Sequence, residues 1–258
     1  MTNILNALRR LLAVPLCLIA VAAAAQTPPP PQMPQPPEIA ARAYLLLDVI
    51  KQAGLPAGIF EVLNVTPDGV TRAINDPRIA AVTLTGSVRA GMAIGAQAGA
   101  ALKKCVLELG GSDPFIVLND ANLDEAVQAA VIGRYQNSGQ VCAAAKRLII
   151  EEGVVEEFTR KFVEATRKLK VGDPLSADTY IGPMARFDLR DELDQQVRDT
   201  LEEGATLLLG GGKTAGAGNY YEPTVLADVT DRMTSFKQEL FGPVASIITA
   251  RDCAHAVA

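Results

Sequence analysis

The sequence contains no tryptophan and has few aromatic residues and little histidine. Aromatic residues make up 5% of its 258 residues, and His255 is the single histidine. The four cysteines show neither CxxC spacing nor a partner histidine; they are Cys17, Cys105, Cys142 and Cys253. Because structural zinc sites use such spacings, this pattern disfavours a metal site, and we predict none.

The scarcity of histidine also limits the kinds of nucleophilic catalysis. Ser-His-Asp and Cys-His enzymes need an imidazole beside the nucleophile. His255 lies near the end of the chain in a segment typical of a helix start, and we interpret it as a solvated side chain rather than a catalytic base. A nucleophilic cysteine would therefore need a carboxylate as its helper.

Runs of basic residues are absent as well. The net charge is −5, and no cluster of lysine and arginine could neutralise a row of phosphates, so we predict no nucleic-acid partner. Hydrophobic residues make up 49% of the chain and charged residues 21%, which is typical of globular proteins. A chain of this length can hold one large or two modest domains.

The N-terminal region resembles an export signal followed by a linker. Two arginines precede the apolar run of residues 11–25, which ends in an A-x-A cleavage pattern and is too short to span a bilayer comfortably. We predict a signal-like segment over residues 1–25, a proline-rich linker over residues 26–37, and no stable membrane span once the leader is removed. An uncleaved anchor and a misassigned start are the alternatives.

From residue 38 onward, helical and strand-like patterns alternate. Helices are predicted over residues 39–53, 68–75, 87–102, 151–170 and 188–203. Strands are predicted over residues 59–63, 80–84, 205–209 and 245–249. This rhythm predicts an α/β fold with a parallel sheet, whose ligands lie beyond the carboxyl ends of the strands.

One strand-to-helix step is a candidate phosphate site. Gly86 lets backbone amides approach an anion, the helix that follows carries partial positive charge at its first turn, and Ser87 adds a hydroxyl donor. The segment matches neither GxGxxG nor the P-loop pattern. A plain helix entry with Ser87 as its N-cap is the alternative.

Glu108 and Cys142 are candidates for acid–base and nucleophilic chemistry. Glu108 lies in an apolar, strand-like run before two glycines, where a carboxylate is costly to bury unless it is hydrogen-bonded or functional. It is either a general base in apolar surroundings or an acceptor of amide hydrogen bonds at a strand end. Cys142 is either a nucleophile or a buried, inert thiol.

Four motifs occur in the order found in the aldehyde dehydrogenase superfamily, which the chain resembles from about Pro36 to its end. They are Thr85-Gly-Ser87, Glu108-Leu-Gly-Gly111, Gly139-Gln-Val-Cys142 and Glu239-Leu-Phe-Gly-Pro243. Residues 135–147 and 172–186 are similar to the succinate-semialdehyde dehydrogenase branch. The resemblance implies an incomplete Rossmann-like, parallel-sheet coenzyme-binding domain over residues 38–109 and an α/β catalytic domain over residues 110–258.

The resemblance also implies a reaction and the residues that perform it. A small-molecule aldehyde would be oxidised to its acid with NAD or NADP, through a thiohemiacetal and a thioester on Cys142. The Cys142 backbone amide would stabilise the oxyanion, and Glu108 would activate water. The implied coenzyme-binding residues are Gly86, Ser87, Gly91, Leu109, Glu239 and Phe241.

The resemblance is incomplete at both ends. The family's oxyanion-hole asparagine, and the lysine and acidic residue that grip the adenosine ribose, have no match here. The family pattern also continues beyond Ala258, with the strand used in oligomerisation, so a homo-oligomer is in doubt. We expect poor activity from this chain alone; a catalytically incompetent relative that binds a nucleotide or a partner is the alternative. The leader favours export, whereas a thiol nucleophile favours the cytoplasm, so the localisation stays open.

Overall fold

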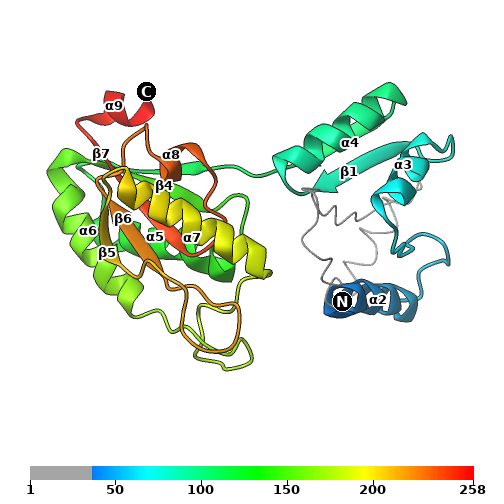
Figure 1. Ribbon diagram of the computed structural model, residues 1–258, viewed down its shortest axis with the longest axis horizontal. Helices are drawn as coiled ribbons and strands as arrows, with labels where there is room; N and C mark the ends of the chain where they lie inside the picture. The colour runs from blue at the N-terminus through cyan, green and yellow to red at the C-terminus, as the bar shows by residue number, and fades with distance from the viewer. Residues whose placement is uncertain (1–36) are drawn as a thin grey trace. The chain divides into compact units, whose positions relative to one another are not determined.

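The computed structural model describes residues 37–258 and their side chains from residue 43 onward (Figure 1). These residues belong to two compact units, the first ending at Gly110 and the second spanning Gly111–Ala258. The predicted leader, and the predicted linker up to residue 36, lie outside the described residues. Pro37 begins the first described helix.

The first unit is built around a parallel pair of strands. In chain order its elements are α2 (Pro37–Gln52), α3 (Pro67–Asn75), β1 (Ala81–Thr85), α4 (Val88–Ala100) and β2 (Lys104–Glu108). α4 connects β1 to β2, and Thr85 lies opposite Glu108 in the ladder. This βαβ arrangement brings the carboxyl ends of both strands to the same edge.

The predicted strand over residues 59–63 is wrong. These residues form bends and irregular structure, and the sheet of the first unit, as described, contains β1 and β2 alone. A strand needs a neighbour to satisfy its backbone N–H and C=O groups, so an apolar run without such a neighbour does not become one.

The second unit contains a five-stranded sheet with the order β3-β4-β7-β6-β5. Its strands are β3 (Asp113–Val117), β4 (Ala145–Glu151), β5 (Thr206–Leu209), β6 (Thr224–Ala227) and β7 (Val244–Ala250). The pairs β3–β4, β4–β7 and β6–β7 are parallel, and β5 is antiparallel to β6 at the edge. The predicted α/β fold with parallel strands is confirmed.

Helices cover both faces of this sheet (Figure 1). α5 (Leu123–Tyr135) and α6 (Glu152–Arg167) pack on one face, and α7 (Phe187–Glu202) and the short α8 (Thr234–Lys237) on the other. Side chains of β7 alternate between the two cores, with Ile247 in the first and Val244 in the second. The chain ends with α9 (Cys253–Val257). In the part of the chain that the structure describes, no helix combines the length and apolarity needed to cross a bilayer.

Candidate functional site

The glycine–serine turn of the first unit lies at the carboxyl ends of its two strands. The Gly86 N–H donates to the Glu108 carbonyl at 3.0 Å, which joins the turn to the end of β2. Ser87 is the N-cap of α4, since its hydroxyl accepts from the Ala90 N–H at 3.3 Å. The structure therefore brings Gly86, Ser87 and Glu108 to one edge of the unit, as the sequence predicted for a ligand site.

Gly91 and Leu109 contact each other beside this turn. A Cβ placed on Gly91 would lie 2.6 Å from Leu109 Cδ1, so the glycine allows the leucine to pack against α4. This close packing fixes the chain directly after Glu108. Contact of either residue with a coenzyme remains a prediction.

Glu108 does not lie in the apolar surroundings that one of its two interpretations required. Its side chain is exposed, as are Val106, at 56%, and Leu107. Helix α4 packs on the β1–β2 pair, but β2 remains largely exposed in this unit. The hydrogen bond at this strand end uses the backbone carbonyl of Glu108.

In the second unit, Cys142 lies in a loop whose backbone turns sharply after α5. The short segment η1 (Gln136–Gly139) places Asn137, Ser138 and Gly139 at φ values of 54°, 56° and 71°. Non-glycine residues adopt this left-handed region at a cost of about 1 kcal/mol or more each. The Asn137 side chain donates to the Gln140 carbonyl at 3.1 Å, and the Ser138 hydroxyl donates to the Gly182 carbonyl at 3.0 Å, which together hold the turn.

The Cys142 side chain is exposed, so the alternative of a buried, inert thiol is wrong. Its backbone N–H has no backbone acceptor among the described residues, which leaves this donor available. Gln140, two residues earlier, accepts from the Ala185 N–H at 2.9 Å through its side-chain oxygen. The loop thus presents a thiol and a free amide together.

The Glu239–Pro243 motif lies against the start of this loop. A Cβ on Gly139 would overlap the carbonyl oxygen of Gly242, so only glycine permits this approach of two backbones. Arg134 at the end of α5 is fully buried, and its guanidinium donates to the carbonyls of Leu240, at 2.8 Å, Gly242 and Val244. Burial lowers the pKa of Arg134 to about 10.

A second buried cation connects Cys142 to Glu239. Lys146, 1% exposed, donates from Nζ to the carbonyls of Val141 at 3.0 Å and Cys142 at 2.7 Å. The same Nζ lies 3.0 Å from Glu239 Oε1. Two segments almost a hundred residues apart in the sequence therefore meet at one ammonium group.

Sequence reasoning missed both Arg134 and Lys146. Glu108 was marked as a candidate because it is a charged residue in an apolar run, and the same holds for Lys146 in residues 143–150. A charged side chain in such a run must be paired if it is buried. Phe241 lies two residues after Glu239 and is partly buried. Its contact with a nicotinamide ring remains a prediction.

In the second unit the candidate residues do not lie at the carboxyl ends of the strands. Cys142 precedes the amino end of β4, and Glu239 and Phe241 precede the amino end of β7. The left-handed turn of η1 and the hydrogen bonds of Arg134 hold the two loops that precede β4 and β7 at these amino ends. Glu108 and Cys142 belong to different units, so their action on one substrate stays a prediction.

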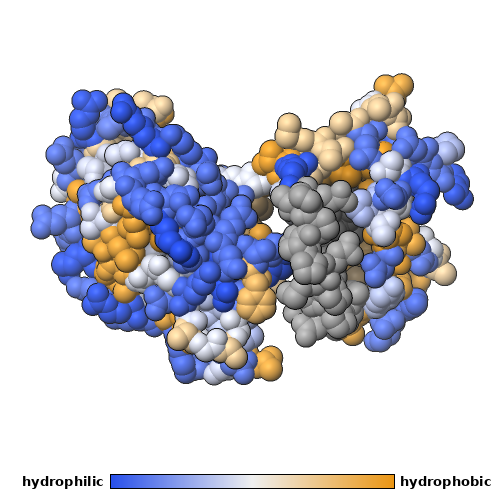
Figure 2. Space-filling model, in the orientation of Figure 1, coloured by the Kyte–Doolittle hydropathy of each residue, from blue (hydrophilic) through white to orange (hydrophobic). Residues whose placement is uncertain are grey.

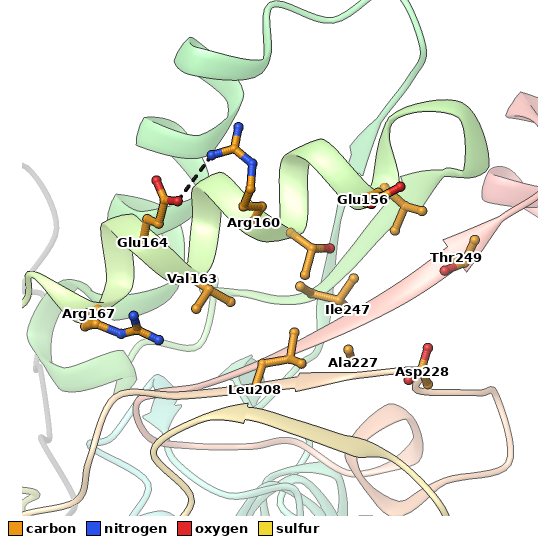
Figure 3. Close-up of a pocket in the computed structure, with 12 residues that line it drawn as sticks. Glu156, Arg160, Val163, Glu164, Arg167, Leu208, Ala227, Asp228, Ile247 and Thr249 are labelled. Carbon is orange, nitrogen blue, oxygen red and sulfur yellow. Dashed lines mark hydrogen bonds and ion pairs between the residues drawn. The ribbon is translucent and has the colours of Figure 1, made fainter.

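An open groove of about 540 Å³ lies elsewhere in the second unit (Figure 3). It lies between α6 and the strands β5, β6 and β7, with Leu208, Ala227 and Ile247 among its lining residues. Figure 2 shows an apolar patch on this unit near β5 and α6. Neither Cys142 nor Glu239 lines the groove, so it is separate from the candidate site. Across residues 37–258, no group of three or more histidine, cysteine, aspartate or glutamate residues could hold a metal ion.

The chain thus combines a parallel α/β fold with an exposed cysteine, in a loop packed against the Glu239–Pro243 motif. Residues 35–258 match the aldehyde dehydrogenase family model, and the chain belongs to this family.

Similar proteins carry related names. The chain is 66% identical over 221 residues to an Escherichia coli succinate semialdehyde dehydrogenase [NAD(P)+], covering 86% of this chain and 48% of that protein. It is 50% identical over 215 residues to a Mycobacterium ulcerans succinate-semialdehyde dehydrogenase [NADP(+)], covering 83% of this chain and 47% of that protein.

A solved structure with the same fold is a Streptococcus pyogenes succinic semialdehyde dehydrogenase in complex with NADP+. The TM-score is 0.82 at 33% identity, over 84% of this chain and 48% of that one. The chain spans about half the length of the relatives it matches.

Proposed function

We propose that this protein takes part in the NAD(P)-dependent oxidation of an aldehyde to its carboxylic acid, with succinate semialdehyde as the substrate. The observation that carries the proposal is the exposed Cys142 thiol, presented beside a free backbone amide in a loop fixed against Glu239. The printed names of the relatives support the choice of substrate and of NAD or NADP.

The residues of the second unit suit the covalent part of this reaction. The Cys142 thiolate attacks the aldehyde carbonyl carbon to form a thiohemiacetal, and its own N–H is placed to donate to the oxyanion. A bound nicotinamide coenzyme supplies the hydride acceptor that converts this adduct to a thioester. Glu108 then removes a proton from the water that attacks the thioester, releasing the acid and the free thiol.

Groups suited to a dinucleotide are present in both units. In the first, Gly86 and Ser87 open α4, a helix of 13 residues whose N-terminal amides favour phosphate. In the second, the Glu239 side chain is 27% exposed and has an oxygen that can accept from a ribose hydroxyl. We assign Gly91 and Leu109 to support of the phosphate turn, and Phe241 to contact with the nicotinamide.

A single-turnover experiment tests the proposal. Purified full chain at a concentration close to that of NADP+ or NAD+ is mixed with succinic semialdehyde, and absorbance of the reduced coenzyme is followed. We expect a burst approaching one equivalent of reduced coenzyme per active site, followed by slow turnover. No burst with either coenzyme would favour the alternative, a catalytically incompetent relative that binds a nucleotide or a partner.

The Glu108→Gln variant separates the second half of the reaction from the first. We expect the burst to remain and the steady-state rate to fall by about 10²-fold or more, since general-base catalysis contributes this much. Glu61→Gln, an exposed carboxylate of the same unit, is the matched control and should behave as wild type. An unchanged steady state in Glu108→Gln would remove Glu108 as the base.

A further inference from the structure

Lys146 is a buried lysine that makes two hydrogen bonds and one ion pair. The carbonyl oxygens of Val141 and Cys142 and the carboxylate oxygen Oε1 of Glu239 lie within 3.0 Å of its Nζ. The ammonium group donates to the two carbonyls, and the Glu239 carboxylate balances its charge. A buried charge is tolerated only when it is paired and hydrogen-bonded in this way.

The pairing divides the Glu239 carboxylate into two unlike oxygens. Oε1 is buried and faces Lys146, whereas the side chain as a whole remains 27% exposed. The open part of the side chain therefore lies away from Oε1. One oxygen is committed to the protein, and the other is left for a ligand that donates a hydrogen bond.

We propose that Lys146 is a positioning residue that connects the coenzyme-binding carboxylate of Glu239 to the backbone of the nucleophile Cys142. This inference rests on the proposed function. Lys146 orients Glu239 so that its free oxygen accepts from a ribose hydroxyl, and it holds the Cys142 carbonyl so that the loop keeps its geometry. Because one ammonium bonds to both groups, occupation of Glu239 by coenzyme changes the environment of the Cys142 thiol.

Coenzyme binding to Lys146→Met, Glu239→Gln and the double variant tests the connection. Calorimetric Kd values for NADP+ should rise about tenfold or more in each single variant, as expected for a lost hydrogen bond to a charged group. The double variant should bind NADP+ no more weakly than the weaker-binding of the two single variants, because both changes break the same connection. Lys168→Met, an exposed lysine of the same unit, is the control and should bind as wild type.

Alkylation of Cys142 by iodoacetamide gives a second readout that a general loss of stability would not produce. It uses a background in which the remaining cysteines are replaced by serine, namely Cys17, Cys105 and Cys253. In this background we expect saturating NADP+ to change the alkylation rate about threefold or more. A change of this size needs less free energy than one hydrogen bond supplies. The change should disappear in Glu239→Gln, which keeps Lys146 and so remains informative if Lys146→Met does not fold.

The possible results separate the two proposals. Three results would overturn the role of Lys146 and leave the proposed function intact. The first is a rise in Kd in the double variant equal to the product of the two single rises, and the second is wild-type binding by Lys146→Met. The third is an alkylation rate that still depends on coenzyme in Glu239→Gln. Wild-type chain that binds neither NADP+ nor NAD+ would overturn the proposed function, and with it the inference.

Discussion

Replacing Cys142 by serine is expected to eliminate the burst of reduced coenzyme and to lower turnover by on the order of 10⁴-fold or more, in line with the loss of a nucleophile elsewhere. A serine hydroxyl is a weak nucleophile unless a base activates it. The single histidine, His255 in α9, is not available as that base, because its Nδ1 accepts from the Arg251 N–H at 3.1 Å. The measurement is the single-turnover assay with succinic semialdehyde.

The fold of this variant should be unaffected. The Cys142 side chain is exposed, so exchanging sulfur for oxygen creates no cavity, and the thermal unfolding midpoint should match that of wild type. Cys253→Ser, a change at another exposed cysteine, is the matched control and should retain the full burst. Turnover retained by Cys142→Ser would rule out Cys142 as the nucleophile.

Replacing Arg134 by methionine is expected to lower the free energy of unfolding by about 2 kcal/mol or more, because each buried carbonyl left without a donor costs about 1–3 kcal/mol. The carbonyls that lose the Arg134 donor belong to Leu240, Gly242 and Val244, and that of Gly242 still accepts from the Val244 N–H at 2.8 Å. Relief from burying a charge offsets part of this loss, since burial already lowers the pKa of Arg134.

Urea unfolding at neutral pH measures this effect. Arg160→Met is the matched control, because Arg160 lies on the surface of α6 in an exposed ion pair with Glu164, and such pairs contribute about 1 kcal/mol or less. Hydrogen exchange should also increase in residues 238–244 of Arg134→Met. Equal stability of the two variants would show that the buried guanidinium does not hold the Glu239–Pro243 motif.

The sequence predicted five of the helices and three of the strands, because their patterns are local. Apolar spacing located α6 and α7 to within a few residues, and Ser87 at a strand-to-helix step marked the start of α4. The strand predicted over residues 59–63 failed because strand formation depends on a partner that local sequence does not specify.

The sequence named candidate site residues, Cys142, Glu108 and Glu239 among them, but not their arrangement. The rule for parallel sheets placed Gly86 and Ser87 correctly at the carboxyl ends of strands. Cys142 and Glu239 lie instead at amino ends of strands, because the left-handed turn after α5 and the hydrogen bonds of Arg134 bring the two loops there.

By itself, the sequence determined the α/β pattern and the residue types available for chemistry, since periodicity and side-chain identity are properties of neighbouring residues. Only the tertiary structure decided that the Cys142 thiol is exposed, that Glu108 is also exposed, and that Lys146 joins Cys142 to Glu239. Burial and the pairing of a buried charge depend on which distant segments fold against each other. In this chain, backbone carbonyls from one segment and a carboxylate from another converge on a single lysine.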